Sequence, residues 1–204
     1  IPLYYDLHMH SCLSPCGDDD MTPANLVGMA AVKGLDVIAL TDHNSCRNCP
    51  AAMKHGEEYG VIVIPGMELT TSEEVHVAAF SDLDDALSFD AYVYDHILPI
   101  KNKEHIFGRQ QIMDKEDHVT GNVERLLISA TDISFDRIFA LVSSYHASHI
   151  RHIDKTTTSL LSNLASFPLT APFFVLKFTI WATFTAYKKS TLTSAMQHLS
   201  AVQM

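Results

Sequence analysis

Apolar segments of strand length alternate with segments that carry helix signals in the first part of the chain. The apolar runs expected to form strands are residues 3–7, 35–40, 61–64 and 75–80. Thr22-Pro23 is a typical helix start, and Gly34 is expected to end that helix. A second helix is expected to begin at Pro50 and to end at Gly60. The order strand, helix, strand, helix, strand predicts parallel strands covered by helices, as in an α/β barrel or an open sheet.

The pattern changes between about residues 90 and 140. Two short segments, 110–114 and 118–123, flank a charged turn and predict a pair of strands. We therefore expect a small inserted subdomain at about 90–140, within a catalytic domain that spans residues 1–164.

The last quarter of the chain differs from the rest, because no Asp or Glu follows Asp154. Its most apolar run, residues 172–182, is too short for a membrane span and is interrupted by Lys177. Buried strands or a core helix are the expected structure there. A second interpretation is that residues 165–204 are a divergent segment that is not native to the fold.

Composition and charge narrow the function classes. The 204 residues include 24 acidic and 14 basic side chains, which gives a formal net charge of −10. A negative surface repels phosphate backbones, and no basic, aromatic-rich track is present, so the sequence argues against long nucleic acid as a partner. Four cysteines and no apparent signal peptide predict a cytoplasmic protein with reduced thiols that does not contact a membrane.

Residues that bind metals follow the predicted strands. His8 and His10 are two residues apart in an extended segment, so both can address one ion. His43 follows the second strand and Glu68 follows the third, just past Pro65-Gly66. Active sites of α/β barrels lie at the carboxyl ends of the strands, where loops converge. The sequence therefore predicts a metal site at this edge of the sheet.

Four motifs in this order resemble those of the PHP (polymerase and histidinol phosphatase) superfamily, with a segment near Asn163 that is similar to its bacterial stand-alone branch. The motifs are Asp-Leu-His-Met-His at 6–10, Leu-Thr-Asp-His-Asn at 40–44, Pro-Gly-Met-Glu at 65–68 and Val-His-Val at 75–77. The resemblance covers about residues 3–164. It implies a distorted TIM-like (β/α)7-type barrel that holds two or three divalent metal ions and hydrolyses phosphoesters.

The resemblance also implies roles for individual residues. The implied metal ligands are His8, His10, Asp18, His43, Glu68, His76 and His152. Asp19 and Asp20 adjoin Asp18 and are alternatives for that position. Glu68 is expected to bridge two ions, and Asp42 to orient a ligand rather than to bind metal. Lys155 occupies the place of a basic residue that grips substrate phosphate, and His10 or His152 is a candidate proton donor to the leaving group.

The last family motif, Asp-x-His, is missing from this chain. His198 is the only histidine beyond His152, and no acidic residue accompanies it. We interpret this absence together with the lost carboxylates as a frameshifted or alternative ending, which predicts a barrel with an incomplete C-terminal part. It also leaves a second function open, namely a degenerate metal-binding scaffold without catalytic activity.

The expected reaction is hydrolysis of a phosphoester by a metal-activated water. Zn, Mn and Fe all suit mixed imidazole and carboxylate ligands. The expected substrate is a phosphorylated small molecule, a nucleotide or the end of an oligonucleotide.

The cysteines support an alternative metal site. Cys46 and Cys49 form a Cys-x-x-Cys motif, and Cys12 and Cys16 lie in a loop that the barrel would bring to the same face. Four thiolates could bind a structural zinc ion. The simpler interpretation is four reduced thiols without a metal.

Overall fold

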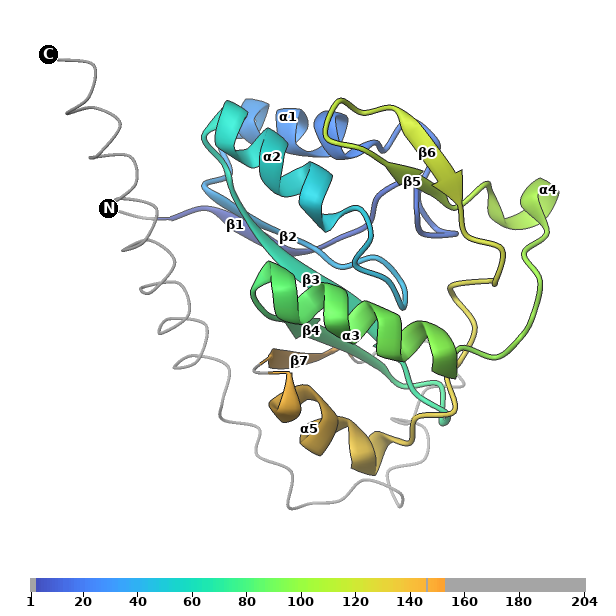
Figure 1. The fold of residues 1–204 in the computed structure, drawn as a ribbon. Coiled ribbons are helices and arrows are strands. Elements are labelled where there is room, and N and C mark those ends of the chain that lie inside the picture. Colours follow the sequence, from blue (N-terminus) through green and yellow to red (C-terminus); the bar gives the residue numbers. More distant parts are fainter. Residues whose placement is uncertain (1–2, 146, 153–204) are drawn as a thin grey trace, which may run out of the picture. The chain divides into compact units, whose positions relative to one another are not determined.

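A computed structural model describes residues 3–145 and 147–152, which build one five-stranded sheet covered by helices and a separate hairpin (Figure 1). The elements in chain order are β1 (Tyr5–Met9), α1 (Pro23–Val32), β2 (Val37–Leu40), α2 (Cys49–Tyr59), β3 (Ile62–Thr70), β4 (His76–Phe80), α3 (Leu83–His96), α4 (Glu104–Phe107), β5 (Gln111–Met113), β6 (Val119–Asn122), α5 (Phe135–Ser144) and β7 (Ser148–His152). The sheet order is β1-β2-β3-β4-β7, and β5 pairs with β6.

The first half of the sheet has the parallel arrangement that the sequence predicts. β1, β2 and β3 are parallel neighbours, and α1 and α2 are the connections between them. The Thr22 side chain accepts a hydrogen bond from the backbone N–H of Asn25, so it caps the start of α1. Gly60 ends α2 in the left-handed conformation, at φ 73°. These local signals bring the carboxyl ends of three strands to one edge of the sheet.

β3 is longer than the sequence predicts, because it continues through Pro65-Gly66 to Thr70. Residues 62–65 pair in parallel with β2, and residues 66–70 pair in antiparallel with β4. Pro65 has no N–H, but its carbonyl accepts a hydrogen bond from the Ser81 amide at 3.3 Å. A Cβ at position 66 would lie 2.9 Å from the Ala79 carbonyl oxygen, so glycine permits the close approach of β4. Glu68 consequently lies within the strand and not after it.

The second half of the sheet is antiparallel and gives the described residues the shape of a curled half-barrel (Figure 1). β4 follows β3 directly without a helix, and β7 pairs in antiparallel with β4. The register places His152 opposite His76. Closure into a (β/α)7-type barrel and the incomplete C-terminal part stay predictions. Lys155, His198 and the whole segment 165–204 lie outside the described residues.

The two faces of the sheet separate the hydrophobic core into a large and a small cluster. Ile38, Val63 and Val77 belong to the large cluster, which also includes residues of α1, α2, α3 and α5. Their neighbours in the strands belong to the small cluster, which contains Leu7, Ala39, Ile64, Ala78 and Phe80. This alternation follows from the twofold period of side chains along a strand.

The hairpin predicted in the region 90–140 is confirmed, since β5 and β6 pair in antiparallel. The hairpin is fastened to the loop that follows β1, because the Gln111 amide donates to the Cys12 carbonyl at 3.1 Å. Asn48 also accepts a hydrogen bond from the Met113 amide at 2.9 Å. α3 and α5 cross the expected limits of the insertion and contribute Phe89 and Ile138 to the large cluster. The domain boundaries themselves stay predictions.

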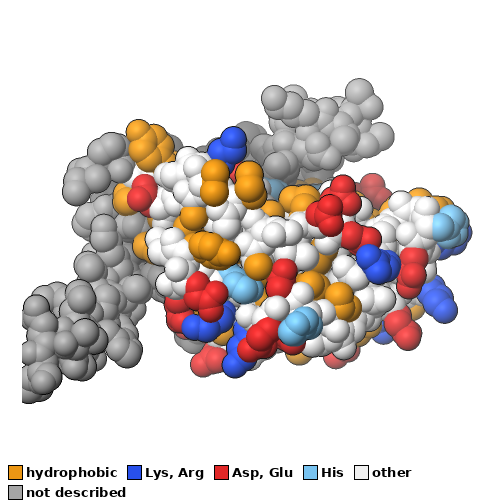
Figure 2. All heavy atoms as spheres, turned by 90° about the horizontal axis from the view of Figure 1, so that it is seen from above, with side chains coloured by type: hydrophobic (Ala, Val, Ile, Leu, Met, Phe, Trp, Pro, Cys, Tyr) orange, Lys and Arg blue, Asp and Glu red, His pale blue; other side chains and the backbone are white. Residues whose placement is uncertain are grey.

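Charged and hydrophobic side chains are interspersed on the face that Figure 2 shows. Lysine and arginine side chains on the described part of that face are scattered among acidic ones. Within residues 3–145 and 147–152, no helix combines the length and the apolar character that crossing a bilayer requires.

Candidate metal centre

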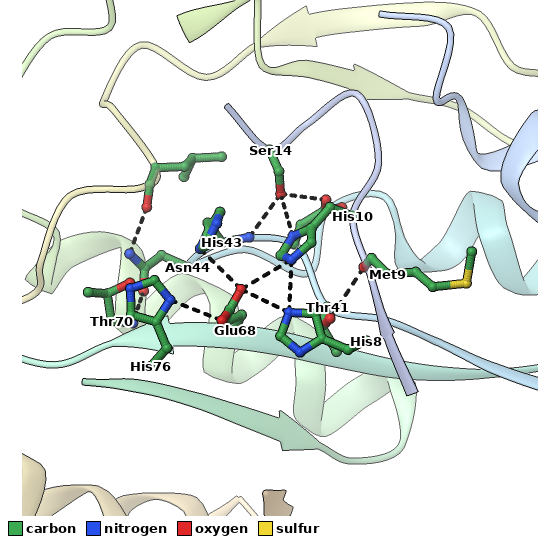
Figure 3. Close-up of polar contacts among 12 residues, drawn as sticks. His8, Met9, His10, Ser14, Thr41, His43, Asn44, Glu68, Thr70 and His76 are labelled. Atoms are coloured by element: carbon green, nitrogen blue, oxygen red, sulfur yellow. Dashed lines mark hydrogen bonds and ion pairs between the residues drawn. The ribbon is translucent and has the colours of Figure 1, made fainter. Parts of the chain in front are cut away.

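Four histidines and one glutamate from four strands meet at one edge of the sheet (Figure 3). His8 belongs to β1, and His10 follows it by two residues on the same side of the chain. His43 follows β2 and forms an isolated parallel bridge with Glu68 of β3. His76 is the first residue of β4. Convergence of these five residues was expected from their positions along the sequence.

The Glu68 carboxylate lies at the centre of this cluster. Its Oε2 atom is 3.1 Å from Nε2 of His8 and 3.1 Å from Nε2 of His10. The same oxygen is 3.4 Å from Nδ1 of His43, while Oε1 is 2.9 Å from Nδ1 of His76. The Glu68 side chain is only 4% exposed. A buried carboxylate thus contacts all four imidazoles.

The cluster contains two candidate metal groups that share Glu68. One consists of His8, His10 and Glu68, and the other of His43, Glu68 and His76. The ligand atoms in each group lie within 4.8 Å of one another. Oε2 contacts the two histidines of the first group and also His43 of the second, whereas Oε1 contacts His76 of the second group. Both carboxylate oxygens thus face imidazole nitrogens, which is compatible with a carboxylate that bridges two ions.

The Ser14 hydroxyl contacts the ring of His10 and the backbone of His43. It is 3.2 Å from Nδ1 of His10, so the Nε2 atom of that ring is left to face Glu68. The same hydroxyl accepts a hydrogen bond from the His43 amide at 3.0 Å and donates one to Asp42 at 2.7 Å. Asp42 also accepts hydrogen bonds from the Ser11 amide and hydroxyl. Asp42 therefore contacts the loop that carries the ligands, as expected of a residue that orients them.

Asn44 fixes the loop that follows His43. It adopts a left-handed conformation with φ 49°, which asparagine tolerates better than most residues. Its amide group donates to the carbonyls of Leu127 and Ser129, and its oxygen accepts from the Thr70 amide. The loop is thereby joined to β3 and to the segment that precedes α5, and the His43 ring is held beside Glu68.

The protonation states in the cluster are set by burial and by mutual contacts. Burial raises the pKa of Glu68, but hydrogen bonds from His10, His76 and His8 outweigh it and hold this pKa well below its usual range. Burial lowers the pKa of His43 to about 3, so its imidazole is neutral and has a free lone pair at neutral pH. Burial also lowers the pKa of His10, but contacts with Cys16 and Glu68 reverse this and raise it to about 10. Burial raises the pKa of Asp42.

The residues fit a divalent metal ion. The Nδ1 atom of His43 is buried and has no hydrogen-bond partner among the described residues, and the His43 side chain is only 6% exposed. Such a buried polar atom costs free energy unless a partner satisfies it. A cation placed between the neutral His43 nitrogen and the Glu68 carboxylate would supply that partner.

The structure does not bring every expected ligand into the cluster. Asp18 is exposed and belongs to none of the candidate metal groups, while its carboxylate accepts a hydrogen bond from the neighbouring Asp19 amide. The Asp19 carboxylate accepts two hydrogen bonds from Arg109. His152 is placed only by its backbone, opposite His76. The assignment of Asp18 and His152 as ligands stays a prediction.

Sequence reasoning did not connect Cys16 with the histidines. A third candidate group consists of His10, Cys16 and His43, again with ligand atoms within 4.8 Å of one another. The sequence contains one sign of this contact, because Cys16 lies in the loop that directly follows the His-x-His pair. The expected loop ligand was instead Asp18, chosen by its distance along the sequence from the helix start at Thr22-Pro23.

The alternative of a four-cysteine zinc site finds no counterpart among the described residues, which include all four cysteines. Cys12, Cys46 and Cys49 are buried. Cys46 and Cys49 direct their thiols at the Gly66 carbonyl, at 3.2 and 3.7 Å. No candidate metal group within the described residues contains more than one cysteine. The simpler interpretation of reduced thiols agrees with this geometry for the three buried residues.

Comparison with known proteins connects this cluster to one family. The PHP domain profile matches residues 6–172, which is most of the chain. In structure, the chain is similar to a "putative metal-dependent phosphoesterase" from Bifidobacterium adolescentis, with a TM-score of 0.51 and 18% sequence identity. The similarity covers 74% of this chain and 67% of that one. Because the sequence identity is only 18%, this similarity shows a shared fold and nothing more.

Three curated relatives match shorter stretches of the chain. An uncharacterized protein from Methanocaldococcus jannaschii is 34% identical over 87 residues, which is 39% of this chain and 51% of the relative. A 5'-3' exoribonuclease from Haemophilus influenzae is 34% identical over 38% of this chain and 28% of its own length. A PolC-type DNA polymerase III from Oceanobacillus iheyensis is 33% identical over 43% of this chain and 6% of its own. The chain thus spans about half or less of these relatives.

Proposed function

The chain belongs to the PHP domain family, and on this basis we propose that it hydrolyses phosphoester bonds with the help of divalent metal ions. The substrate class that we propose is a small phosphomonoester, a nucleotide or the end of an oligonucleotide. The observation that carries the proposal is the buried Glu68 carboxylate, whose two oxygens contact four imidazoles in two candidate metal groups.

The proposed ligands are His8, His10, His43, Glu68 and His76. Glu68 would bridge two ions, because each of its oxygens is directed at a different set of histidines. His43 would bind as a neutral ligand without losing a proton, since burial lowers its pKa to about 3. Imidazole and carboxylate ligands of this kind suit Zn, Mn or Fe. When bound, such ions lower the pKa of water and neutralise charge that develops on the phosphoryl oxygens.

We assign His10 to metal binding rather than to proton transfer. Its Nε2 faces Glu68 and its Nδ1 is 3.2 Å from the Ser14 hydroxyl, so both nitrogens have partners within the cluster. The proton for the leaving alkoxide would then come from His152, which lies next to the cluster in the register of β7 and β4. Lys155 would bind a phosphate oxygen of the substrate.

The names of two relatives bear on the substrate. One is named a 5'-3' exoribonuclease and another a PolC-type DNA polymerase III. This agrees with a nucleotide or an oligonucleotide end as substrate.

Phosphate release from a panel of esters would test the proposed reaction. The full chain would be loaded with Mn²⁺ or Zn²⁺ and given phosphomonoesters, nucleoside bisphosphates and short single-stranded RNA. We expect metal-dependent release from at least one class, and its loss in His8→Ala and Glu68→Gln.

His118→Ala is a matched control, because His118 is exposed on the hairpin and contacts Asp114 rather than the cluster. This variant should retain the activity of the wild type. Equal release by wild type and Glu68→Gln, or release that persists after chelation of the metal, would contradict the proposal.

A further inference from the structure

Cys16 is the one cysteine whose thiol is accessible to solvent. It is exposed, whereas Cys12, Cys46 and Cys49 are buried. Its sulfur lies within 4.8 Å of a ring nitrogen of His10 and of one of His43. The rings of these two histidines stack with their centroids 4.7 Å apart and an angle of 26° between their planes. The sulfur and the two rings thus share one space beside Glu68.

His43 supplies an independent sign that this space receives a ligand. Its side chain is 6% exposed, and its Nδ1 atom has no hydrogen-bond partner in the part of the chain that the structure describes. The 3.4 Å separation from Glu68 Oε2 does not form a hydrogen bond that would satisfy it. A buried imidazole in this state is satisfied by a cation more readily than by water, since water would need several polar partners.

The loop holds Cys16 in position from both sides. Before it, the Ser14 hydroxyl is bonded to Asp42, and the Ser14 amide donates to the Ser11 carbonyl at 3.0 Å. After it, the Gly17 amide donates to the Ser14 carbonyl at 2.9 Å. The Cys12 amide also donates a hydrogen bond to the Met21 carbonyl at 2.8 Å, which joins the two ends of the loop. A thiol on such a constrained turn loses little conformational entropy when it binds a ligand.

We propose that Cys16 is a thiolate ligand of the metal centre, together with His10 and His43, and that it makes this centre select Zn²⁺ over Mn²⁺. The inference rests on the proposed metal centre and adds a sulfur ligand to it. Thiolate favours soft or borderline cations such as Zn²⁺ and Co²⁺, whereas Mn²⁺ prefers oxygen ligands. On binding, the thiol releases its proton to solvent and the sulfur donates a lone pair to the cation.

Titration of the full chain with Co²⁺ would test the sulfur ligand directly. A thiolate bound to Co²⁺ adds charge-transfer absorption in the near ultraviolet, while the visible bands report on Co²⁺ bound by any ligands. We expect both signals in the wild type and in Cys12→Ala, which removes a buried thiol outside the candidate group. In Cys16→Ser the charge-transfer band should disappear while visible bands remain. Visible bands without charge transfer in the wild type would overturn the role of Cys16 and leave the metal centre intact.

Affinities for two metals provide a second measurement. Cys16→Ser should weaken Zn²⁺ binding by at least about tenfold, since even the loss of an outer partner of a ligand costs about 10–100-fold. Cys16→Asp should bind Mn²⁺ more tightly relative to Zn²⁺ than the wild type does, because it replaces sulfur by oxygen. An unchanged ratio of the two affinities in both variants would contradict the proposal. Failure of the wild type to bind Co²⁺, Zn²⁺ or Mn²⁺ would overturn the proposed metal centre itself.

Discussion

The Ser14 hydroxyl donates a hydrogen bond to Oδ1 of Asp42 at 2.7 Å and so joins the loop after β1 to the end of β2. Both partners are buried, and the Ser14 oxygen also contacts the His10 ring and the His43 amide. One hydroxyl group therefore contacts the ring of His10 and the backbone of His43, two of the proposed ligands. Partners of this kind set the direction of a metal-binding ring and raise its affinity.

Ser14→Ala should weaken metal binding without unfolding the protein. The substitution removes the oxygen that contacts the His10 ring, so the ring gains freedom to rotate away from Glu68. Loss of such an outer partner costs about 10–100-fold in metal affinity. Calorimetric titration with Zn²⁺ would measure the change, and far-ultraviolet circular dichroism would check the fold. Ser144→Ala is the control, because that hydroxyl donates to the Leu141 carbonyl at the exposed end of α5 and belongs to no candidate metal group among the described residues. Equal affinities for all three proteins would contradict the role of Ser14.

Glu68→Gln should lower the metal content more than His76→Ala. Glu68 belongs to two candidate groups, whereas His76 belongs to one, so the first change affects two ions and the second affects one. The neutral amide also removes the negative charge that offsets the cations. Metal analysis of the dialysed proteins would give the ratio of ions to chain. Equal losses in the two variants would argue against a bridging carboxylate.

The elements and ligands that could be predicted from sequence are those with strong local signals. Thr22-Pro23 and Gly60 mark helix ends by backbone chemistry that depends little on distant residues. His8, His10 and His43 were placed together because parallel strands bring their carboxyl ends to one edge. This reasoning holds in the part of the sheet where the strands are in fact parallel.

What the sequence did not reveal depends on contacts between distant segments. β3 passes through Pro65-Gly66 because β4 folds back on it, and only the pairing of the two strands shows this. Cys16 reaches the cluster because turns of the loop bring it back over His10 and His43. Counting residues along an irregular loop cannot detect such a turn, so Cys16 was not among the expected ligands. Asp18 stays a predicted ligand, and Cys16 is the loop residue that shares a candidate metal group with His10 and His43.

Glu73→Gln should make the stability of the fold less sensitive to acid. The Glu73 carboxylate accepts a hydrogen bond at 2.9 Å from the amide of Phe135, the first residue of α5. Partial burial raises the pKa of Glu73, but this bond and others lower it further, so its pKa lies below the ordinary value. A carboxyl group with a depressed pKa stabilises the folded state above its unfolded pKa of about 4.3, and the contribution is lost as the pH falls through the folded value.

Urea unfolding of wild type and Glu73→Gln at several pH values would measure this contribution. At neutral pH the variant should be less stable by under about 1 kcal/mol, because solvent screens an exposed carboxylate. The difference should shrink as the pH falls through the folded pKa. A difference that stays constant, or that grows in acid, would show that Glu73 does not act through its charge.

His152→Ala should reduce phosphoester hydrolysis more than His149→Ala. The two histidines belong to the same strand, but the register places His152 opposite His76 and His149 opposite Ala79. Loss of a general acid typically costs about 10²–10⁴-fold in rate. Turnover of an ester with a good leaving group should be affected less, since that leaving group needs no proton. Equal activities of the two variants with a poor leaving group would remove His152 from the mechanism.

Gly17→Ala should displace the loop that carries Cys16, because a Cβ at position 17 would collide with the Ser11 carbonyl group. The obstacle is backbone, which cannot rotate aside as a flexible side chain can. Relief of the collision must therefore move residues 14–17 and weaken the bond between Ser14 and Asp42. Overpacking of this kind costs about 1–3 kcal/mol, and metal affinity should fall with it.

Gly121→Ala is the matched control for this change, since a Cβ at position 121 meets no atom of the described residues within 4 Å. Thermal unfolding with and without Zn²⁺ separates the two effects of Gly17→Ala. A lower Tm in both conditions would reflect the strained loop, and a smaller increase in Tm on adding Zn²⁺ would reflect the displaced ligands. If Zn²⁺ raises the Tm of Gly17→Ala by as much as it raises the Tm of Gly121→Ala, the turn at Gly17 has no part in positioning the metal ligands. The geometry of the cluster would then depend on its strands alone.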